Sequence, residues 1–136
     1  MAGYSHTPLP KKLGIKERSK VALIDPPRGF QKVLGSLPQA AAIQVGLMGK
    51  DRFDVIFAFV TTRAALQRQV TAARRHMTPA AGLWIAWPKR ASGVATDVTE
   101  NVVRDVALPT GRVDNEVCAI DETWSGLRLV IRLALR

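Results

Sequence analysis

The sequence predicts an α/β fold: a mostly parallel sheet with helices on both faces and an antiparallel hairpin strand at the C-terminal end. Short continuous apolar runs, such as residues 55–60 and 83–87, are typical of strands buried on both faces. Segments with helical periodicity alternate with these runs along the chain. The last segment, residues 127–133, instead alternates apolar with mostly basic side chains, which favours a strand with one solvated face. The length of 136 residues is that of one domain.

Residues 1–19 are expected to form a basic N-terminal extension with a short helix, and residues 20–136 a single domain. Thr7 is expected to cap that helix, with Pro8 at its first position and Gly14 after its end. The apolar side chains available to dock it on the domain are Leu9, Leu13 and Ile15.

The first half of the domain is predicted to contain three strands. Residues 20–25 form the first strand, and residues 29–34 follow it as one or two helical turns. Residues 41–45 are a weak strand candidate because their alanines also suit a helix. The clearest strand covers residues 52–60.

A longer helix is predicted from a cap at Thr61 or Thr62 to about Met77. Its expected inner face consists of Leu66, Val70, Ala73 and Met77. Its expected outer face consists of Arg63, Gln67, Arg68, Arg74 and Arg75. Pro79 and Gly82 are expected to separate this helix from the strand that begins at Leu83.

The strand at residues 83–87 should end at Pro88, which cannot donate to a sheet. A small polar loop, residues 89–96, follows it, and a helix is predicted over residues 97–107. Asp97 and Glu100 have the spacing of a capping box. The expected inner face of this helix is Val98, Val102 and Val106. Strands at residues 113–120 and 127–133 then form the hairpin, giving the order β-α-β-β-α-β-α-β-β.

The charge is strongly basic, with 20 Lys and Arg against 11 Asp and Glu, and the excess lies within residues 1–100. Such a bias favours an anionic ligand, nucleic acid or simply solubility. Nucleic-acid binding is therefore an alternative function, although no basic run exceeds two residues and no aromatics are interleaved with them. The residues that would carry it are Arg63, Arg68, Arg74, Arg75, Lys11 and Lys12.

Several classes of site are disfavoured by the residues present. Cys118 is the single cysteine and lies in an apolar run, so it is expected to be buried and inert. His6 and His76 have no cluster of ligand residues around them, so no metal site is predicted. No nucleophile elbow or phosphate loop is present. No apolar run approaches the about 20 residues of a membrane span, and there is no signal peptide, so a cytoplasmic protein is expected.

The candidate ligand site is the carboxyl rim of the sheet, because open α/β sheets bind ligands there. The loop after Trp87 offers cations, a hydroxyl and open backbone before a helix N-terminus, a combination suited to phosphate or carboxylate. Trp84 and Trp87 should face opposite sides of their strand, and Trp87 is the better candidate for stacking on a ligand. The predicted ligand-binding residues are Asp25, Arg28, Gly29, Thr61, Thr62, Trp87, Lys89, Arg90, Ser92, Gly93, Thr96 and Asp97.

The predicted order of elements resembles a shortened class I methyltransferase Rossmann-like fold, a three-layer sandwich whose sheet also ends in an antiparallel hairpin. The resemblance covers residues 20–132 and implies that one strand–helix unit is missing between Val45 and Arg52. It also implies S-adenosylmethionine as the cofactor. The family has a glycine-rich turn after its first strand and an acidic residue after its second. Here Asp25-Pro26-Pro27-Arg28-Gly29 and Val45-Gly46 stand at those places.

The whole chain also resembles a family of small bacterial proteins of unknown function. The stretches that carry this resemblance are residues 2–5, 13–15, 87–97 and 124–127. Together these observations predict a non-catalytic binding or regulatory module with a small-ligand site at the rim. The alternatives are a methyltransferase-like enzyme with an altered cofactor loop and a nucleic-acid-binding protein. A homodimer through sheet edges is compatible with the sequence.

Overall fold

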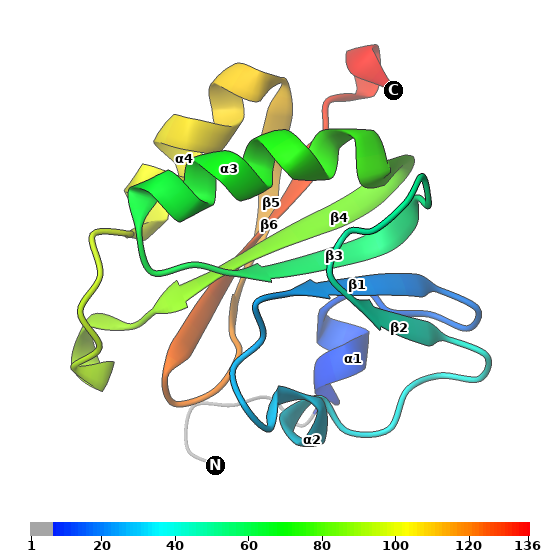
Figure 1. The fold of residues 1–136 in the computed structure, drawn as a ribbon, viewed down its shortest axis with the longest axis horizontal. Helices are drawn as coiled ribbons and strands as arrows, with labels where there is room; N and C mark the ends of the chain where they lie inside the picture. Colours follow the sequence, from blue (N-terminus) through cyan, green and yellow to red (C-terminus); the bar gives the residue numbers. More distant parts are fainter. Residues whose placement is uncertain (1–6) are drawn as a thin grey trace.

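The computed structural model describes residues 7–136, in which one six-stranded sheet with the order β2-β1-β3-β4-β6-β5 lies between two layers of helices (Figure 1). The strands are β1 (Lys20–Ile24), β2 (Ala42–Val45), β3 (Phe53–Phe59), β4 (Met77–Pro88), β5 (Arg112–Ala119) and β6 (Trp124–Ile131). The first four strands pair in parallel, whereas β6 is antiparallel to both β4 and β5. The predicted fold class is therefore confirmed. The stretch of the family resemblance at residues 2–5 lies outside the described residues.

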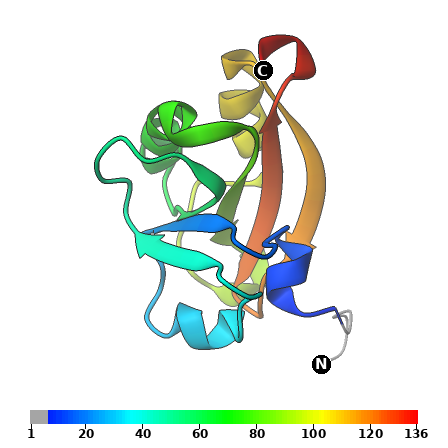
Figure 2. The ribbon, with the colours of Figure 1, turned by 90° about the vertical axis from the view of Figure 1, so that its right-hand side faces the viewer.

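Helices cover both faces of the sheet, as the sequence predicts. The helices are α1 (Leu9–Lys12), α2 (Phe30–Leu34), α3 (Arg63–Ala73) and α4 (Glu100–Ala107). The two longer helices, α3 and α4, pack on one face, and the two short ones lie against the other (Figures 1 and 2). Residues 46–52, between β2 and β3, contain neither helix nor strand, in agreement with the missing strand–helix unit.

The α3–α4 face of the sheet is covered by small and branched apolar side chains. Leu66, Val70 and Ala73 of α3 are at most 1% exposed, so the predicted inner face of this helix is confirmed up to its end. From α4 the fully buried side chains are Val103 and Ala107. Val102 and Val106, predicted to face inward, only pack at the margin of this core, because α4 begins later than predicted and its register on the sheet is shifted.

The α1–α2 face is packed by aromatic side chains. Phe30 of α2 contacts Phe57 and Phe59 of β3, with ring centroids 5.3 and 4.8 Å apart. Trp84 of β4 stacks on Phe57, and its Nε1 donates a hydrogen bond of 2.9 Å to the carbonyl of Leu13. This bond fixes the segment after α1 to the sheet. Leu13 and Ile15 are buried in the same core, whereas Leu9 packs at its edge.

Three predicted boundaries are wrong. Helix α3 ends at Ala73, a short 3₁₀ turn covers Arg74–His76, and β4 already begins at Met77. Pro79 does not separate helix from strand, because the pairing of β3 with β4 passes from Phe53↔Met77 directly to Val55↔Gly82, which leaves the proline in an irregular stretch that needs no ladder bond. At the C-terminal end, β6 stops at Ile131, and Leu133 is 80% exposed in a 3₁₀ turn.

The first helix also starts differently from the prediction. Pro8 occupies the N-cap position of α1, in place of Thr7, and its carbonyl accepts the N–H of Lys12 at 3.1 Å. Gly14 follows the helix with φ = 81°, as predicted from its position. Within residues 7–136, no helix has the length and apolar character needed to span a membrane.

Candidate functional site at the carboxyl rim

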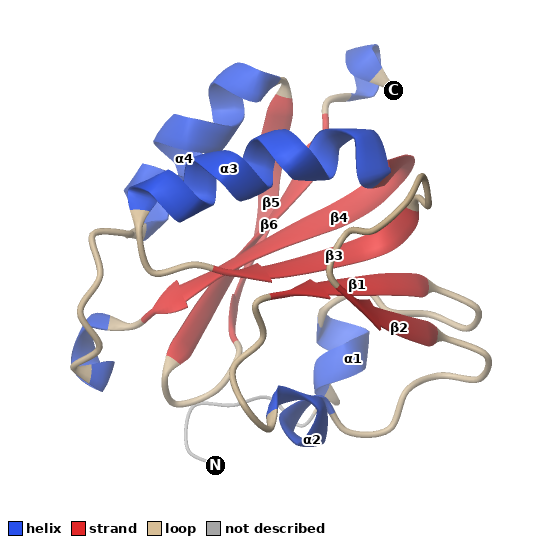
Figure 3. Cartoon of the chain, in the orientation of Figure 1, coloured by secondary structure: helices blue, strands red, loops and turns tan. Residues whose placement is uncertain are grey.

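The strand order places a topological switch point between β1 and β3. After β1 the chain passes through α2 on one face to reach β2, and after β3 it passes through α3 on the other face to reach β4 (Figure 3). The two connections therefore leave the carboxyl ends of the neighbouring strands β1 and β3 on opposite faces of the sheet. Open α/β sheets bind their ligands at such a point.

The β1 side of the switch point has an unusual backbone. Asp25, directly after β1, is exposed and has φ = 51°, a left-handed conformation that Asp tolerates better than most residues. Pro26 and Pro27 follow and offer no backbone N–H. Arg28 and Gly29 are also exposed, and Gly29 has φ = 81° at the N-cap position of α2. This turn therefore presents a carboxylate and a guanidinium to solvent.

The neighbouring end of β2 is formed by Gly46. It has φ = 89°, and its N–H donates a bond of 2.7 Å to the carbonyl of Leu23 in β1. The chain thus turns away at the position where the methyltransferase-like family has its acidic residue.

The β3 side of the switch point is joined to the loop after β4 by side-chain hydrogen bonds. Thr96 Oγ1 donates to the carbonyl of Thr61 at 2.6 Å and accepts from the N–H of Val98 at 3.0 Å. Thr62 caps α3 by accepting from the N–H of Ala65 at 3.1 Å. These threonines therefore fix the loop and begin the helix, and the predicted cap of α3 is confirmed at Thr62.

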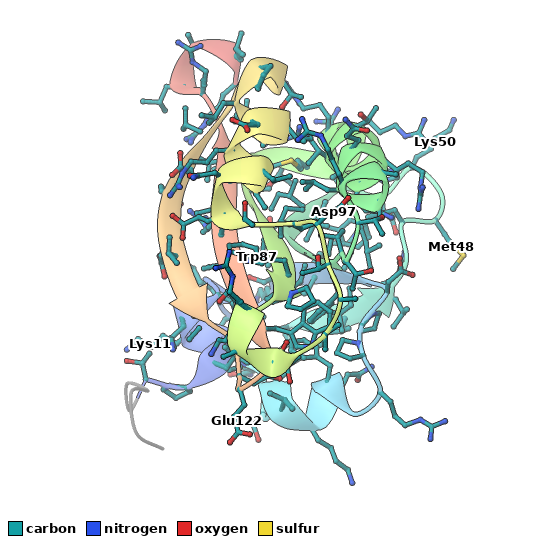
Figure 4. The ribbon with its side chains drawn as sticks, turned by 90° about the vertical axis from the view of Figure 1, so that its left-hand side faces the viewer. Lys11, Met48, Lys50, Trp87, Asp97 and Glu122 are labelled. Carbon is teal, nitrogen blue, oxygen red and sulfur yellow. The ribbon has the colours of Figure 1, made fainter. Side chains whose placement is uncertain are left out.

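Asp97 has a different partner from the predicted one. Its Oδ1 accepts the N–H of Arg63, the first residue of α3, at 2.8 Å. The helix that follows Asp97 is capped by Thr99, which accepts from the N–H of Val102. The predicted capping box is therefore wrong, because the chain stays extended through Val98 and Thr99 before α4 begins. The Asp97 carboxylate lies at the positive end of α3, where a bound anion would otherwise be favoured (Figure 4).

The rest of the loop after β4 is held by local bonds. The N–H of Lys89 donates to the carbonyl of Thr123 at 2.7 Å, and its own carbonyl accepts from Ser92 Oγ at 2.6 Å. Ser92 Oγ also accepts from the N–H of Val94 at 3.2 Å. Arg90 and Gly93 are exposed, and Gly93 has φ = 77°. The loop is thus held by its own hydrogen bonds, and Arg90, in a short 3₁₀ turn, is exposed while Lys89 is half-buried.

The two tryptophans of β4 face opposite sides of the sheet, as predicted. Trp84 is fully buried on the α1–α2 face, and Trp87 is 7% exposed on the α3–α4 face. In Figure 4 Trp87 lies just above the loop after β4. Most of its ring surface is covered by the protein, so little of it is open for stacking.

Apart from Trp87 and the predicted residues at positions 89–93, the predicted site residues fall into two groups. Asp25, Arg28 and Gly29 form the open β1 side of the switch point, whereas Thr61, Thr62, Thr96 and Asp97 tie β3 and α3 to the loop after β4. The N-terminus of α4, proposed from the sequence as an anion site, has Glu100, whose Oε2 pairs with Arg104 at 2.6 Å. Asp25 and Asp97 are both exposed, but the Oδ1 of Asp97 is already bound to the N–H of Arg63.

The predicted nucleic-acid residues do not share one surface. Arg63, Arg68, Arg74 and Arg75 are exposed on α3 and the turn after it. Lys11 and Lys12 belong to α1, on the opposite face of the sheet (Figure 4). A shallow hollow on the outer surface of α3 is lined by Gln67, Arg68, Thr71, Ala72, Arg74 and Arg75.

Three further titratable side chains are buried. Cys118 is 5% exposed, as predicted, and burial is the main factor that raises the pKa of its thiol. His76 is 2% exposed, and its Nδ1 lies 2.8 Å from the carbonyl of Asp51. Arg112 is 1% exposed, which sequence reasoning missed because an arginine at the start of a strand ordinarily extends into solvent. Among residues 7–136, no group of three or more His, Cys, Asp and Glu could hold a metal.

Comparison with solved structures shows a methyltransferase-like fold. A SAM-dependent methyltransferase from Aquifex aeolicus superimposes with a TM-score of 0.64 and 16% identity, over 89% of this chain and 87% of that one. TrmN from Thermus thermophilus gives a TM-score of 0.61 with 9% identity, over 90% of this chain and 47% of that one. Aeropyrum pernix fibrillarin, solved with natively bound S-adenosyl-L-methionine, gives a TM-score of 0.59 with 14% identity, over 94% of this chain and 70% of that one. No protein-family model and no curated protein matches the sequence. What these likenesses establish is the Rossmann-like fold of class I methyltransferases.

Proposed function

We propose that this chain is a methyltransferase-like domain that binds S-adenosylmethionine or S-adenosylhomocysteine at the switch point between β1 and β3. The observation that carries the proposal is the strand order, which sends the chain to opposite faces of the sheet after these two neighbouring strands, beside an exposed, left-handed Asp25. The similar fold of proteins described as SAM-dependent methyltransferases supports this choice of ligand.

The residues at the switch point fit such a ligand in part. The exposed carboxylate of Asp25 can accept hydrogen bonds from ribose hydroxyls or from the ligand's amino group. Arg28 can pair with the carboxylate of the ligand. Pro26 and Pro27 remove two backbone donors, and Gly46 supplies no acidic group after β2. The proposal is therefore one of binding, and methyl transfer to an acceptor is not part of it.

Calorimetric titration of the full chain with each adenosyl compound tests the proposal. We expect a micromolar Kd, weakened about tenfold or more by Asp25→Asn, because a hydrogen bond to a charged group is lost. Asparagine is chosen because it tolerates the left-handed backbone of this position. Asp105→Asn, an exposed carboxylate on α4, is the matched control and should leave the Kd unchanged. Absence of heat and of any thermal shift at millimolar ligand would rule the proposal out.

A second candidate is nucleic-acid binding through the outer surface of α3. It is favoured by four exposed arginines on this helix and its C-terminal turn, three of which, Arg68, Arg74 and Arg75, line the hollow described above. Binding of a single-stranded oligonucleotide whose logarithmic affinity falls steeply with salt would support it. An unchanged affinity in an Arg68→Ala/Arg75→Ala double variant would exclude this surface.

A further inference from the structure

Arg112 is a buried cation at the amino edge of the sheet, where the parallel strands begin. The switch point lies at the other end of these strands. Arg112 opens β5 where the chain leaves the turn after α4, and its side chain is 1% exposed. In the sheet it pairs with Ile131, at the end of β6. It lies on the α3–α4 face, as does Asp114 two residues later, which bonds to Arg104 of α4.

The guanidinium of Arg112 is only partly satisfied. Its Nη1 donates a 3.0 Å bond to Thr110 Oγ1, whereas Nε and Nη2 are buried without a hydrogen-bond partner among the described residues. A buried charge without partners is costly, and arginine is ordinarily buried only when it is paired. Nearly all buried polar groups in native proteins have a partner, so two free donors on one guanidinium call for an acceptor.

The surroundings of Arg112 supply more positive charge instead of a counterion. Burial and the nearby charge of Arg74 together lower its pKa to about 10. Arg136 is also close, because its Nε donates at 2.8 Å to the carbonyl of Ile131, the pairing partner of Arg112. The acidic side chains Glu100 and Asp114 on this face are both bound to Arg104.

Of the basic residues around Arg112, Arg74 is the one whose charge acts on its guanidinium most directly. Arg74 is exposed and follows the last residue of α3, and it also lines the shallow hollow on the outer surface of that helix.

We propose that Arg112 and Arg74 form a binding site for a phosphate group at the amino edge of the sheet. Guanidinium groups bind phosphate with pairs of parallel hydrogen bonds, and two of them can neutralise its double charge. The phosphate is either free or part of a polynucleotide backbone. The site does not depend on the proposed adenosyl site, which lies at the other end of the strands.

Thermal unfolding of the full chain in sodium phosphate tests the site, with sodium chloride at equal ionic strength as the reference. At a phosphate concentration tenfold above Kd, we expect the Tm of the wild-type chain to rise by about 5 °C. Arg112→Met replaces the buried charge with an apolar side chain of similar length. Its Tm without phosphate should equal or exceed that of the wild type, and its response to phosphate should be lost.

Arg128→Met is the matched control, because it removes one arginine from β6 on the opposite face of the sheet. It should keep the full response to phosphate. A rise in Tm that is equal in the wild type and Arg112→Met, or absent from the wild type, would overturn the proposal.

A second titration distinguishes the two sources of phosphate. A single-stranded oligonucleotide that binds the wild type at least tenfold more tightly than Arg112→Met indicates a polynucleotide. Equal affinity of the two chains for the oligonucleotide, with the phosphate response still lost in Arg112→Met, indicates a free phosphate.

Discussion

The carboxyl edge and the amino edge of the sheet are the two ends of its parallel strands. They differ in whether the donor groups there find partners within the chain. At the carboxyl edge the N–H groups at the start of α3 find partners within the chain, in Asp97 and Thr62. At the amino edge Arg112 is buried beside Arg74 with two donors unsatisfied. The carboxyl edge near α3 is therefore closed by the protein's own side chains. Among the side chains of residues 7–136, the buried donors without a partner belong to Arg112, at the amino edge.

The difference between the two edges determines which kind of ligand each edge can bind. In an open α/β fold the carboxyl edge is the default site, and helix N-termini there favour anions. Here Asp97 already occupies the N-terminus of α3, which leaves the β1 side of the switch point, with Asp25, for an adenosyl ligand. The amino edge is not the usual ligand site of such folds, yet its buried arginine makes it the better candidate for phosphate.

Helix α3 spans both edges, so loosening it should affect both. Leu66→Ala removes a fully buried side chain from the middle of α3 and should lower the free energy of unfolding by about 3 kcal/mol. It should also weaken binding at both proposed sites. Urea unfolding measures the loss. Gln67→Ala, on the outer face of the same helix, should change stability by less than about 0.5 kcal/mol. An equal effect of the two variants would contradict this packing of α3.

The hydrogen bond between Asp97 and Arg63 at the carboxyl edge is expected to contribute less to the free energy of unfolding. Asp97→Ala removes the acceptor at the start of α3 and should cost about 1 kcal/mol. Amide hydrogen exchange should become faster at Arg63, whereas the exchange at Ala65, capped by Thr62, should change less. Glu122→Ala, an exposed carboxylate in the β5–β6 turn, is the control (Figure 4). Protection at Arg63 that survives the loss of Asp97 would show that this bond is not maintained in solution.

The smallest expected effect concerns Cys118, which belongs to neither edge site. Burial raises the pKa of its thiol, so less thiolate is present at pH 8 than in a free cysteine, and the sulfur is covered. Alkylation by iodoacetamide should be at least about tenfold slower than for a free thiol, and it should become fast on unfolding in urea. The rate should rise with pH, because deprotonation increases the reactive fraction. Rapid labelling of the folded chain would contradict the buried position.

The sequence by itself determined the order of elements and most of the core. Continuous apolar runs and helical spacing are local properties, so β3, the inner face of α3 and the opposite orientation of Trp84 and Trp87 could be predicted. The resemblance to methyltransferases likewise anticipated the missing strand–helix unit before β3. The positions of the rim loops could also be predicted from their turn residues, because the backbone conformation of a turn depends on immediate neighbours in the sequence.

Only the tertiary structure decided which groups meet. Asp97 was predicted to cap the helix that follows it, but its partner is the N–H of Arg63, 34 residues earlier in the chain. No sequence pattern singled out Arg112, yet in the folded chain it is 1% exposed and lies within reach of the charge of Arg74. Hydrogen bonds and desolvation at these positions depend on contacts between segments that are distant in sequence. Local periodicity and capping patterns carry no information about such contacts.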